Sequence, residues 1–174
     1  LDELFLPSNI DSSKSNETFT VYSKQGGSIT LTILNPEGPS LNLSYTTYGH
    51  WVFKDDAFQE NFATGYMVFG IRTAAESMPV SGTATFNGQT VGTMVDAGGT
   101  LYTVSGTGSL AADFAAATVS GNFTGMEARN VQNSAVKPWR DFTTTGTISG
   151  NTFNGSAATK DGVLSGLHYG GFFG

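Results

Sequence analysis

Cysteine is absent from the 174 residues of this chain. Disulfide bonds, thiolate metal sites, a cysteine nucleophile and a lipidated cysteine within these residues are therefore excluded. Charged residues make up only 13% of the sequence, Lys and Arg never form a run, and the net charge is −6. Because binding to a nucleic-acid backbone depends on neutralising several phosphates, we expect no nucleic-acid partner.

Long apolar runs are also missing, since no stretch approaches the roughly 20 apolar residues that a membrane helix needs. Residues 1–11 lack the basic and apolar regions of a signal peptide. A chain rich in Ser, Thr, Gly and Asn with few charges is typical of exported bacterial proteins. We therefore expect a bacterial surface or secreted protein, which would be held at a membrane only through a lipid anchor outside these residues.

The sequence instead has strong alternation of apolar and polar residues with a period of two, which indicates β-strands. Residues 17–23 and 28–34 flank a Gln-Gly-Gly turn and predict a first hairpin. Residues 41–53 predict a long strand with a bulge at Gly49, and further hairpins are expected from Pro79 onward. One of these has Asn87 and Gly88 as its turn, and another turns at residues 150–151.

The strands after residue 79 alternate small residues with Phe and Leu on one face, and Ser, Thr and Asn on the other. Such a pattern suits the interior of a narrow barrel that is filled by its own side chains. The sequence thus predicts an all-β fold, a small antiparallel up-and-down β-barrel of about eight strands. Residues 1–40 are expected to form an N-terminal hairpin region, and residues 41–174 the barrel.

Several motifs in this order resemble the β-barrel domain of transferrin-binding protein B. They lie at residues 79–88, 92, 112–114, 118–121, 148–155 and 170–174, with two further short matches at residues 48–51 and 68–70. The family's barrel is eight-stranded and closes with a Gly-x-Phe-Phe-Gly-Pro motif. Only the first part of that motif is present, at Gly170–Gly174. The resemblance therefore implies a truncated last strand and one barrel edge that is incompletely paired.

The resemblance implies a non-catalytic protein. Members of the family are outer-membrane surface lipoproteins, or secreted relatives, that bind host iron or haem proteins or other ligands. It thus suggests a module that binds a host or environmental protein, or a small ligand, with a role in iron or haem acquisition. No residue matches the family's contact loops. The alternative is a structural barrel of a larger envelope protein with no ligand site of its own.

Aromatic and histidine side chains gather in one candidate site near residue 50. Tyr48, His50 and Trp51 lie close in sequence, and a histidine is a common haem or metal ligand. The alternative interpretation is the aromatic face at the end of a strand. No cofactor is expected, with haem kept as an option, and the spacing of the histidines does not indicate a structural metal site.

The connection at residues 126–141 is a second candidate site, because it is longer than a hairpin usually needs. It contains Arg129, Trp139 and Arg140, and Trp and Arg are enriched at binding hot spots. Long loops on rigid barrels often carry function. The alternative is that Trp139 folds back and plugs one end of the barrel.

Signals for catalysis are weak. No Gly-x-Ser-x-Gly motif occurs. Asp55, Asp56 and Glu60 could form a carboxylate site for calcium or for acid–base catalysis, but we interpret them as a solvated acidic loop. We therefore expect no enzyme. An integral outer-membrane barrel is a further alternative, but its outward faces would have to be apolar. The expected outward faces carry rows of hydroxyl and amide groups instead, as at residues 118–124 and 145–149.

Overall fold

The computed structural model describes residues 4–36, 43–54 and 62–174, and most of these lie in β-strands. Its strands are β1 (Phe19–Lys24), β2 (Ile29–Leu34), β3 (Thr46–Lys54), β4 (Phe62–Gly70), β5 (Thr83–Val95), β6 (Leu101–Asp113), β7 (Thr118–Asn130), β8 (Val136–Pro138), β9 (Phe142–Ser149), β10 (Thr152–Thr159) and β11 (Ser165–Gly171). Short 3-10 helices are η1 (Pro7–Asn9), η2 (Gln25–Gly27) and η3 (Ala75–Ser77). No helix in the described ranges is long and apolar enough to span a membrane.

The chain divides into two compact units. The first comprises Leu1–Ile71 with Phe173–Gly174, and the second comprises Arg72–Phe172. The strand pairing respects this division, because β1 to β4 form one antiparallel sheet and β5 to β11 form another. Strands β3 and β4 lie in the range that was expected in the barrel, but in the structure β3 pairs with β2 of the N-terminal hairpin and β4 pairs with β3. The expected domain boundary between residues 40 and 41 stays a prediction.

The first sheet has the order β1-β2-β3-β4. Its β1–β2 hairpin, with Val21 opposite Thr32, confirms the hairpin that alternation predicted. The bulge expected at Gly49 is wrong. The register of β3 runs without a shift through this residue against β4, and up to this residue against β2. Gly49 instead lets its neighbours approach closely, since a Cβ there would lie 3.3 Å from the Thr32 carbonyl oxygen and 3.4 Å from Met67 Cγ.

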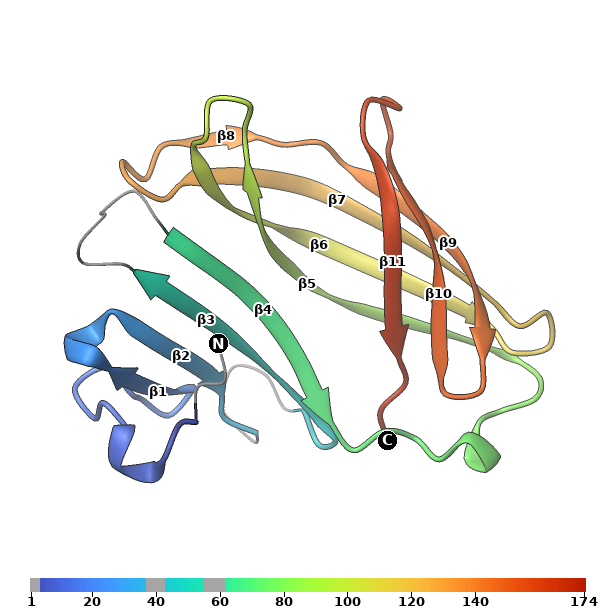
Figure 1. Cartoon of the computed structure of the whole chain (residues 1–174). Helices are drawn as coiled ribbons and strands as arrows, with labels where there is room; N and C mark the ends of the chain where they lie inside the picture. The colour runs from blue at the N-terminus through green and yellow to red at the C-terminus, as the bar shows by residue number, and fades with distance from the viewer. Residues whose placement is uncertain (1–3, 37–42, 55–61) are drawn as a thin grey trace. The chain divides into compact units, whose positions relative to one another are not determined.

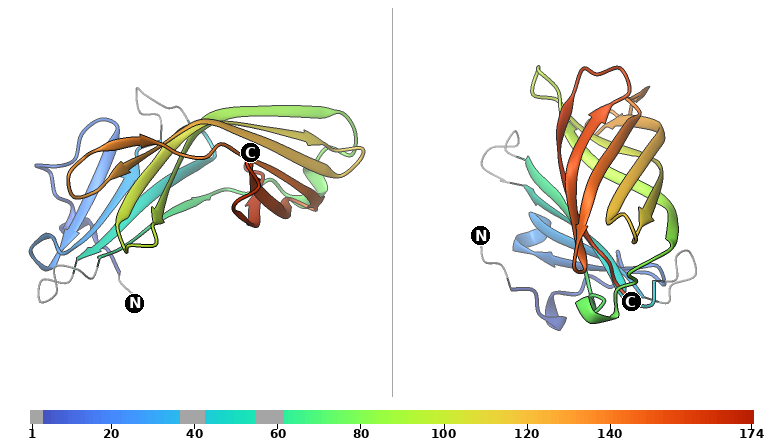
Figure 2. Two further views of the ribbon diagram at one scale, coloured as in Figure 1. Left: turned by 90° about the horizontal axis from the view of Figure 1, so that it is seen from above. Right: turned by 90° about the vertical axis from the view of Figure 1, so that its right-hand side faces the viewer.

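The second sheet has the order β11-β10-β9-β7-β6-β5, with the short β8 paired to β7 (Figure 1). Apart from β8, which lies between β7 and β9 along the chain, neighbours in this order follow one another in sequence, so the predicted up-and-down antiparallel arrangement is confirmed. The strands curl into a half-barrel (Figure 2). Within residues 72–172, β5 pairs only with β6, and β11 pairs only with β10. Two strand edges thus lack a second partner among the described residues.

Alternation along the strands separates the two faces of the half-barrel. Polar side chains such as Thr85, Ser120 and Thr145 are exposed on the outer face, as the sequence pattern predicts. Val104, Met126 and Ala128 are buried on the inner face and form a cluster at one end of it. Residues that pack around this cluster are Met94, Tyr102, Phe123, Trp139 and Phe142.

A β-bulge in β7 determines which residues enter this cluster. Thr107 lies opposite Thr124, whereas Ser105 lies opposite Glu127, so β7 carries one extra residue at this point. Gly125 sits in the bulge with a φ of 62°, a conformation that glycine adopts without steric cost. The extra residue reverses the alternation, and Met126 therefore points inward even though it is three residues after the inward-facing Phe123.

Two expectations about turns in this sheet fail. The turn expected at Asn87 and Gly88 is absent, because β5 continues through both residues with Gly88 opposite Gly108. The long connection expected at residues 126–141 is shorter, because β7 continues to Asn130 and β8 pairs back onto it. By contrast, the hairpin between β9 and β10 turns at residues 150–151 as predicted.

Candidate functional site

The β7–β8 hairpin is the first candidate site, and its turn is built by asparagine side chains. The Asn130 side-chain oxygen accepts hydrogen bonds from the backbone N–H groups of Gln132 and Asn133, at 2.8 and 3.2 Å. The oxygen of Asn133 accepts one from the Ala135 N–H at 3.0 Å. Asparagine is favoured in turns because its side chain bonds to nearby backbone in this way. These bonds hold the tip of the hairpin in a defined shape.

Exposed charges lie along this hairpin. Arg129 is exposed, and its Nη1 donates a hydrogen bond to the Ser134 carbonyl oxygen at 3.2 Å. The Nζ of Lys137 lies 4.0 Å from the centre of the Tyr102 ring, a cation–π contact. Glu127 is exposed on the same strand as Arg129. Both cations are therefore oriented by neighbours while they remain accessible to a partner.

Trp139 follows this hairpin and packs inward. Its ring lies 6.3 Å from that of Phe142 in an edge-to-face arrangement, and it contacts the cluster of Val104, Met126 and Ala128. The backbone N–H of Trp139 also donates to the Met126 carbonyl oxygen at 2.7 Å. Trp139 therefore packs against the buried cluster at one end of the half-barrel. A contact of its ring with a partner stays a prediction.

Arg140 contacts a different element from Arg129. Its guanidinium forms an ion pair with Asp161, in the turn between β10 and β11. The neighbouring residues form a second pair, between Lys160 and Asp141 at 3.7 Å. The Lys160 N–H also donates to the Asp141 carbonyl oxygen at 2.9 Å. The structure thus links Arg140 to the β10–β11 turn by charge, rather than leaving it free beside Arg129.

The second candidate site, around residue 50, is divided between the faces of β3. Tyr48 and His50 lie on one face, and Trp51 lies on the other because successive side chains alternate. The Trp51 ring packs over Gly65, where a Cβ would lie 2.8 Å from its Nε1. His50 stacks on Tyr66 at 4.4 Å between ring centres. The structure therefore does not unite Trp51 with His50 as the sequence suggested.

Hydrogen bonds fix the His50 ring. The Thr64 hydroxyl donates to the Trp51 carbonyl oxygen at 2.8 Å and lies 2.6 Å from His50 Nε2. Since a hydroxyl has one proton, Nε2–H is the donor in the second bond. Burial lowers the pKa of His50 below its usual 6.5. Burial, together with the nearby Tyr48, raises the pKa of Tyr66. This face thus holds a neutral histidine whose Nε2 is protonated.

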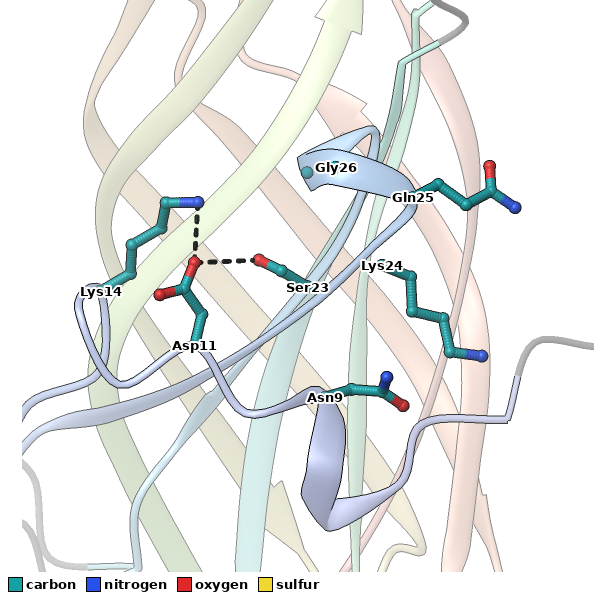
Figure 3. Close-up of a pocket in the computed structure, with 8 residues that line it drawn as sticks. Asn9, Asp11, Lys14, Ser23, Lys24, Gln25 and Gly26 are labelled. Carbon is teal, nitrogen blue, oxygen red and sulfur yellow. Dashed lines mark hydrogen bonds and ion pairs between the residues drawn. The ribbon is translucent and has the colours of Figure 1, made fainter.

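A polar pocket in the first unit was missed in the sequence. Figure 3 shows Asp11, Lys14 and Ser23 among the residues that line it, and its volume is about 540 Å³. The Asp11 carboxylate accepts hydrogen bonds from the Ser13 hydroxyl at 2.6 Å and the Ser23 hydroxyl at 3.3 Å, and it pairs with Lys14 at 2.9 Å. The Ser13 and Lys14 contacts lower the pKa of Asp11 to about 2. The sequence could not predict this pocket, because its lining residues between 9 and 27 come together only in the folded chain.

Metal-binding geometry is absent from the described residues, where no group of three or more His, Asp or Glu side chains gathers. The acidic residues Asp55, Asp56 and Glu60 lie outside the described ranges. Their interpretation as a solvated loop therefore stays a prediction.

Comparison with protein families gives a match to residues 78–174. The matched family is described as the C-lobe and N-lobe beta barrels of Tf-binding protein B. This match covers more than half of the chain. The chain belongs to this family. The resemblance that the sequence motifs suggested is thereby confirmed for residues 78–174, which include β5 to β11 and hence Arg129, Trp139 and Arg140.

Solved structures of transferrin-binding protein B share the fold. One is a tryptophan-to-alanine mutant of the vaccine antigen from Haemophilus parasuis Hp5, with a TM-score of 0.57 and 20% identity over 92% of this chain and 31% of that protein. Another is the intact Ap-TbpB with N and C lobes, with a TM-score of 0.57 and 18% identity over 92% of this chain and 33% of that protein. The chain thus spans about a third of the length of each. A search among curated proteins found no match.

Proposed function

We propose that this chain is a non-catalytic binding module of a bacterial surface or secreted protein that takes part in iron acquisition by binding a host protein. Membership of the transferrin-binding protein B barrel family carries this proposal. The solved relatives are named for binding transferrin. Because the chain spans about a third of their length, its own share in such binding has to be tested directly.

The exposed part of the β7–β8 hairpin is the surface that we assign to the partner. Arg129 is exposed there, and its hydrogen bond to Ser134 restrains the side chain before binding. Restraint of this kind reduces the entropy that is lost on association. Arginine also ranks among the residues that contribute most at interfaces. Trp139 would support this surface from below through its contacts with Phe142 and Met126.

The hydrogen bonds of the two histidines favour a protein partner over haem, because both Nε2 atoms are already engaged. The Nε2 of His50 carries a proton and donates to Thr64. The Nε2 of His168 lies 3.2 Å from the Thr145 carbonyl oxygen, which can only accept, so this nitrogen is also protonated. Iron ligation by Nε2 would need both hydrogen bonds to break. We therefore expect no haem absorbance band that depends on His50 when haemin is titrated into the protein.

Capture experiments test the proposal. The immobilised chain is exposed to a panel of mammalian transferrins, iron-loaded and iron-free, and binding is followed by interferometry. Arg129→Ala should weaken capture roughly tenfold, as loss of an interface arginine does. Arg140→Ala is the matched control, because it removes the same charge from a side chain that already pairs with Asp161. If no transferrin is captured by the unchanged protein, the structural-barrel alternative is favoured instead.

The cellular location belongs to the same proposal. A lipid anchor outside these residues, or secretion, would place the module where a host protein can reach it. Protease treatment of intact cells that express the complete gene should digest the domain, while a cytoplasmic marker protein stays whole. Protection of the domain until the cells are lysed would contradict a surface location.

A further inference from the structure

The outer face of the half-barrel changes in character at one end. Along most of this face the exposed side chains are polar, as at Thr85, Ser120 and Thr145. At the end that holds the β5–β6 turn and the β7–β8 hairpin (left in Figure 1), four valines are between 42% and 62% exposed. They are Val91, Val95, Val131 and Val136. A group of exposed apolar residues with polar surroundings is typical of a protein-binding surface.

The strand register places these valines side by side. Val95 of β5 lies opposite Leu101 of β6, and the Leu101 carbonyl oxygen accepts a hydrogen bond from the Val131 N–H at 3.2 Å. Val136 of β8 lies opposite Arg129 of β7. Residues directly opposite one another share a face and have Cβ atoms about 5 Å apart. We call this group the valine surface, and its members are Val91, Val95, Leu101, Arg129, Val131 and Val136.

The bulge at Gly125 turns Arg129 toward the valine surface. Phe123 points inward, so an uninterrupted alternation along β7 would also send Arg129 inward. The extra residue reverses this alternation, and Arg129 lies opposite Thr103, two residues along β6 from Leu101. Arg129 and Leu101 therefore point to the same outer face. Because β-bulges often redirect a side chain at a functional site, the outward position of Arg129 favours a role in binding.

Arg129 differs from Arg140 in having no anionic partner. Arg140 pairs with Asp161, whereas no ion pair joins Arg129 to another described residue. The Nη1 of Arg129 donates to the Ser134 carbonyl oxygen, and the other N–H groups of a guanidinium can offer two parallel hydrogen bonds to a carboxylate. Apolar neighbours exclude water from such a contact and strengthen it. The valine surface therefore suits a carboxylate that is itself flanked by apolar groups.

The charges of this region limit the kind of partner further. Glu127 is exposed two residues before Arg129 and points to the same face. Lys137 points to the opposite face, where its Nζ contacts the Tyr102 ring. One cation beside one anion does not suit a polyanion such as a nucleic acid, which needs several cations. It does suit a protein surface with a single carboxylate at the centre of the contact.

We propose that the valine surface binds the protein partner at a patch where one carboxylate is surrounded by apolar side chains. Arg129 forms a bidentate ion pair with this carboxylate, and the valines pack against the apolar groups around it. The inference rests on the proposed function, and it extends the contact from the β7–β8 hairpin onto β5 and β6. It also defines the chemistry of the partner's side of the interface.

Valine substitutions test the apolar part of this contact. The immobilised chain is exposed to the same panel of transferrins, and affinities are measured by interferometry. Val95→Thr and Val136→Thr keep the side-chain shape and replace one methyl group by a hydroxyl, so each should weaken capture roughly fourfold, the effect of one buried methyl group. Val80→Thr is the matched control. Val80 is 88% exposed and lies before the start of β5, at the opposite end of this strand from Val95, so its substitution should leave the affinity unchanged.

Charge reversal tests the carboxylate. Arg129→Ala removes the cation, whereas Arg129→Glu also places an anion against the partner's carboxylate, and like charges in contact repel. Arg129→Glu should therefore bind at least about tenfold more weakly than Arg129→Ala. Equal binding by the two variants would show that the partner offers a neutral group, and the proposed carboxylate would be wrong. All the substituted positions are exposed, so folding should be retained, and circular dichroism checks this for each variant.

The outcomes distinguish this inference from the proposed function. If Arg129→Ala weakens capture while both valine variants behave like Val80→Thr, the valine surface is refuted and the proposed function stands. If the unchanged chain captures no transferrin, both are refuted. Light scattering covers a further occupant. A dimer of the unchanged chain that Val95→Thr weakens and that excludes transferrin would mean that a second copy, rather than a host protein, occupies the valine surface.

Discussion

The ring of Phe172 lies 5.4 Å from that of Phe153, centre to centre, at an interplanar angle of 61°. The same ring is 6.2 Å from Phe86 and 5.8 Å from Phe114. Phe86 belongs to β5 and Phe153 to β10, so Phe172 joins strands near both ends of the strand order. The Gly-Gly-Phe-Phe-Gly segment, which the sequence links to barrel closure, thus contributes an aromatic contact across the half-barrel.

Replacement of Phe172 should destabilise the second unit. Phe172→Ala removes three ring contacts and leaves a cavity, so we expect the free energy of unfolding to fall by about 2 kcal/mol for this half-buried side chain. Urea denaturation measures the change. Tyr169→Ala is the control, because Tyr169 is 76% exposed on the adjoining strand and its loss should cost less than about 0.5 kcal/mol. Equal effects of the two substitutions would argue against the bridging role of Phe172.

Glycines on the inner face differ in how much space surrounds them. A Cβ at Gly155 would contact the Thr145 carbonyl oxygen and lie 2.8 Å from His168 Nε2, whereas a Cβ at Gly166 would meet nothing within 4 Å. Gly155→Ala should therefore lower the free energy of unfolding by about 1–3 kcal/mol. Gly166→Ala should leave it within about 0.5 kcal/mol. Thermal melts of the two variants give the comparison, and a more stable Gly155→Ala protein would refute it.

Substitutions of Trp139 and Arg129 should distinguish a residue that stabilises the fold from one that only contacts a partner. Trp139→Ala removes a ring from the cluster of Val104, Met126 and Ala128, so we expect a loss of about 2–3 kcal/mol in the free energy of unfolding. Arg129→Ala removes an exposed side chain and should change stability by less than about 0.5 kcal/mol. Denaturant titration of both variants, made before any binding assay, shows which losses of capture reflect unfolding. A stable Trp139→Ala protein would favour the interpretation of Trp139 as a surface contact.

The alternation of residues predicted most of the strands, but it could not predict where that alternation reverses. The sequence predicts a connection that begins at residue 126, because the alternation of Val119, Gly121 and Phe123 stops at Gly125. In the structure Gly125 forms a bulge, and the strand continues with Met126 inward. A bulge and a strand end give the same local signal, which is a glycine that interrupts the apolar–polar alternation. Only the pairing of β7 with β6 distinguishes the two.

Local turn signals failed for a related reason. Asn87 and Gly88 favour a hairpin turn in isolation, yet β5 gains a continuous ladder with β6 by remaining extended. In the candidate sites, residues that are close in sequence are separated in the structure. Trp51 and His50 are adjacent in sequence but lie on opposite faces of β3, and Arg140 is bound by Asp161. Such contacts come from residues distant in sequence, so spacing alone could not predict them.

The pH dependence of stability should show the environment of His50. Burial lowers its pKa in the folded protein below the 6.5 of an unperturbed histidine, so the unfolded chain binds the proton more tightly. The free energy of unfolding is therefore unaffected by His50 above about pH 6.5. It falls as the pH decreases from 6.5 toward the folded pKa, and it becomes constant again below that value.

Protonation of His50 does not break its Nε2–H bond to Thr64, so the desolvation of the charged ring is the physical origin of this loss. His50→Gln keeps a hydrogen-bonding side chain and removes the titration. The variant should lack the His50 contribution between pH 6.5 and the folded pKa, while groups such as Asp11, with a pKa of about 2, act at lower pH in both proteins. Denaturation at several pH values and an NMR titration of the His50 ring measure the two quantities. A His50 pKa at or above 6.5 would contradict the buried, neutral state of this ring.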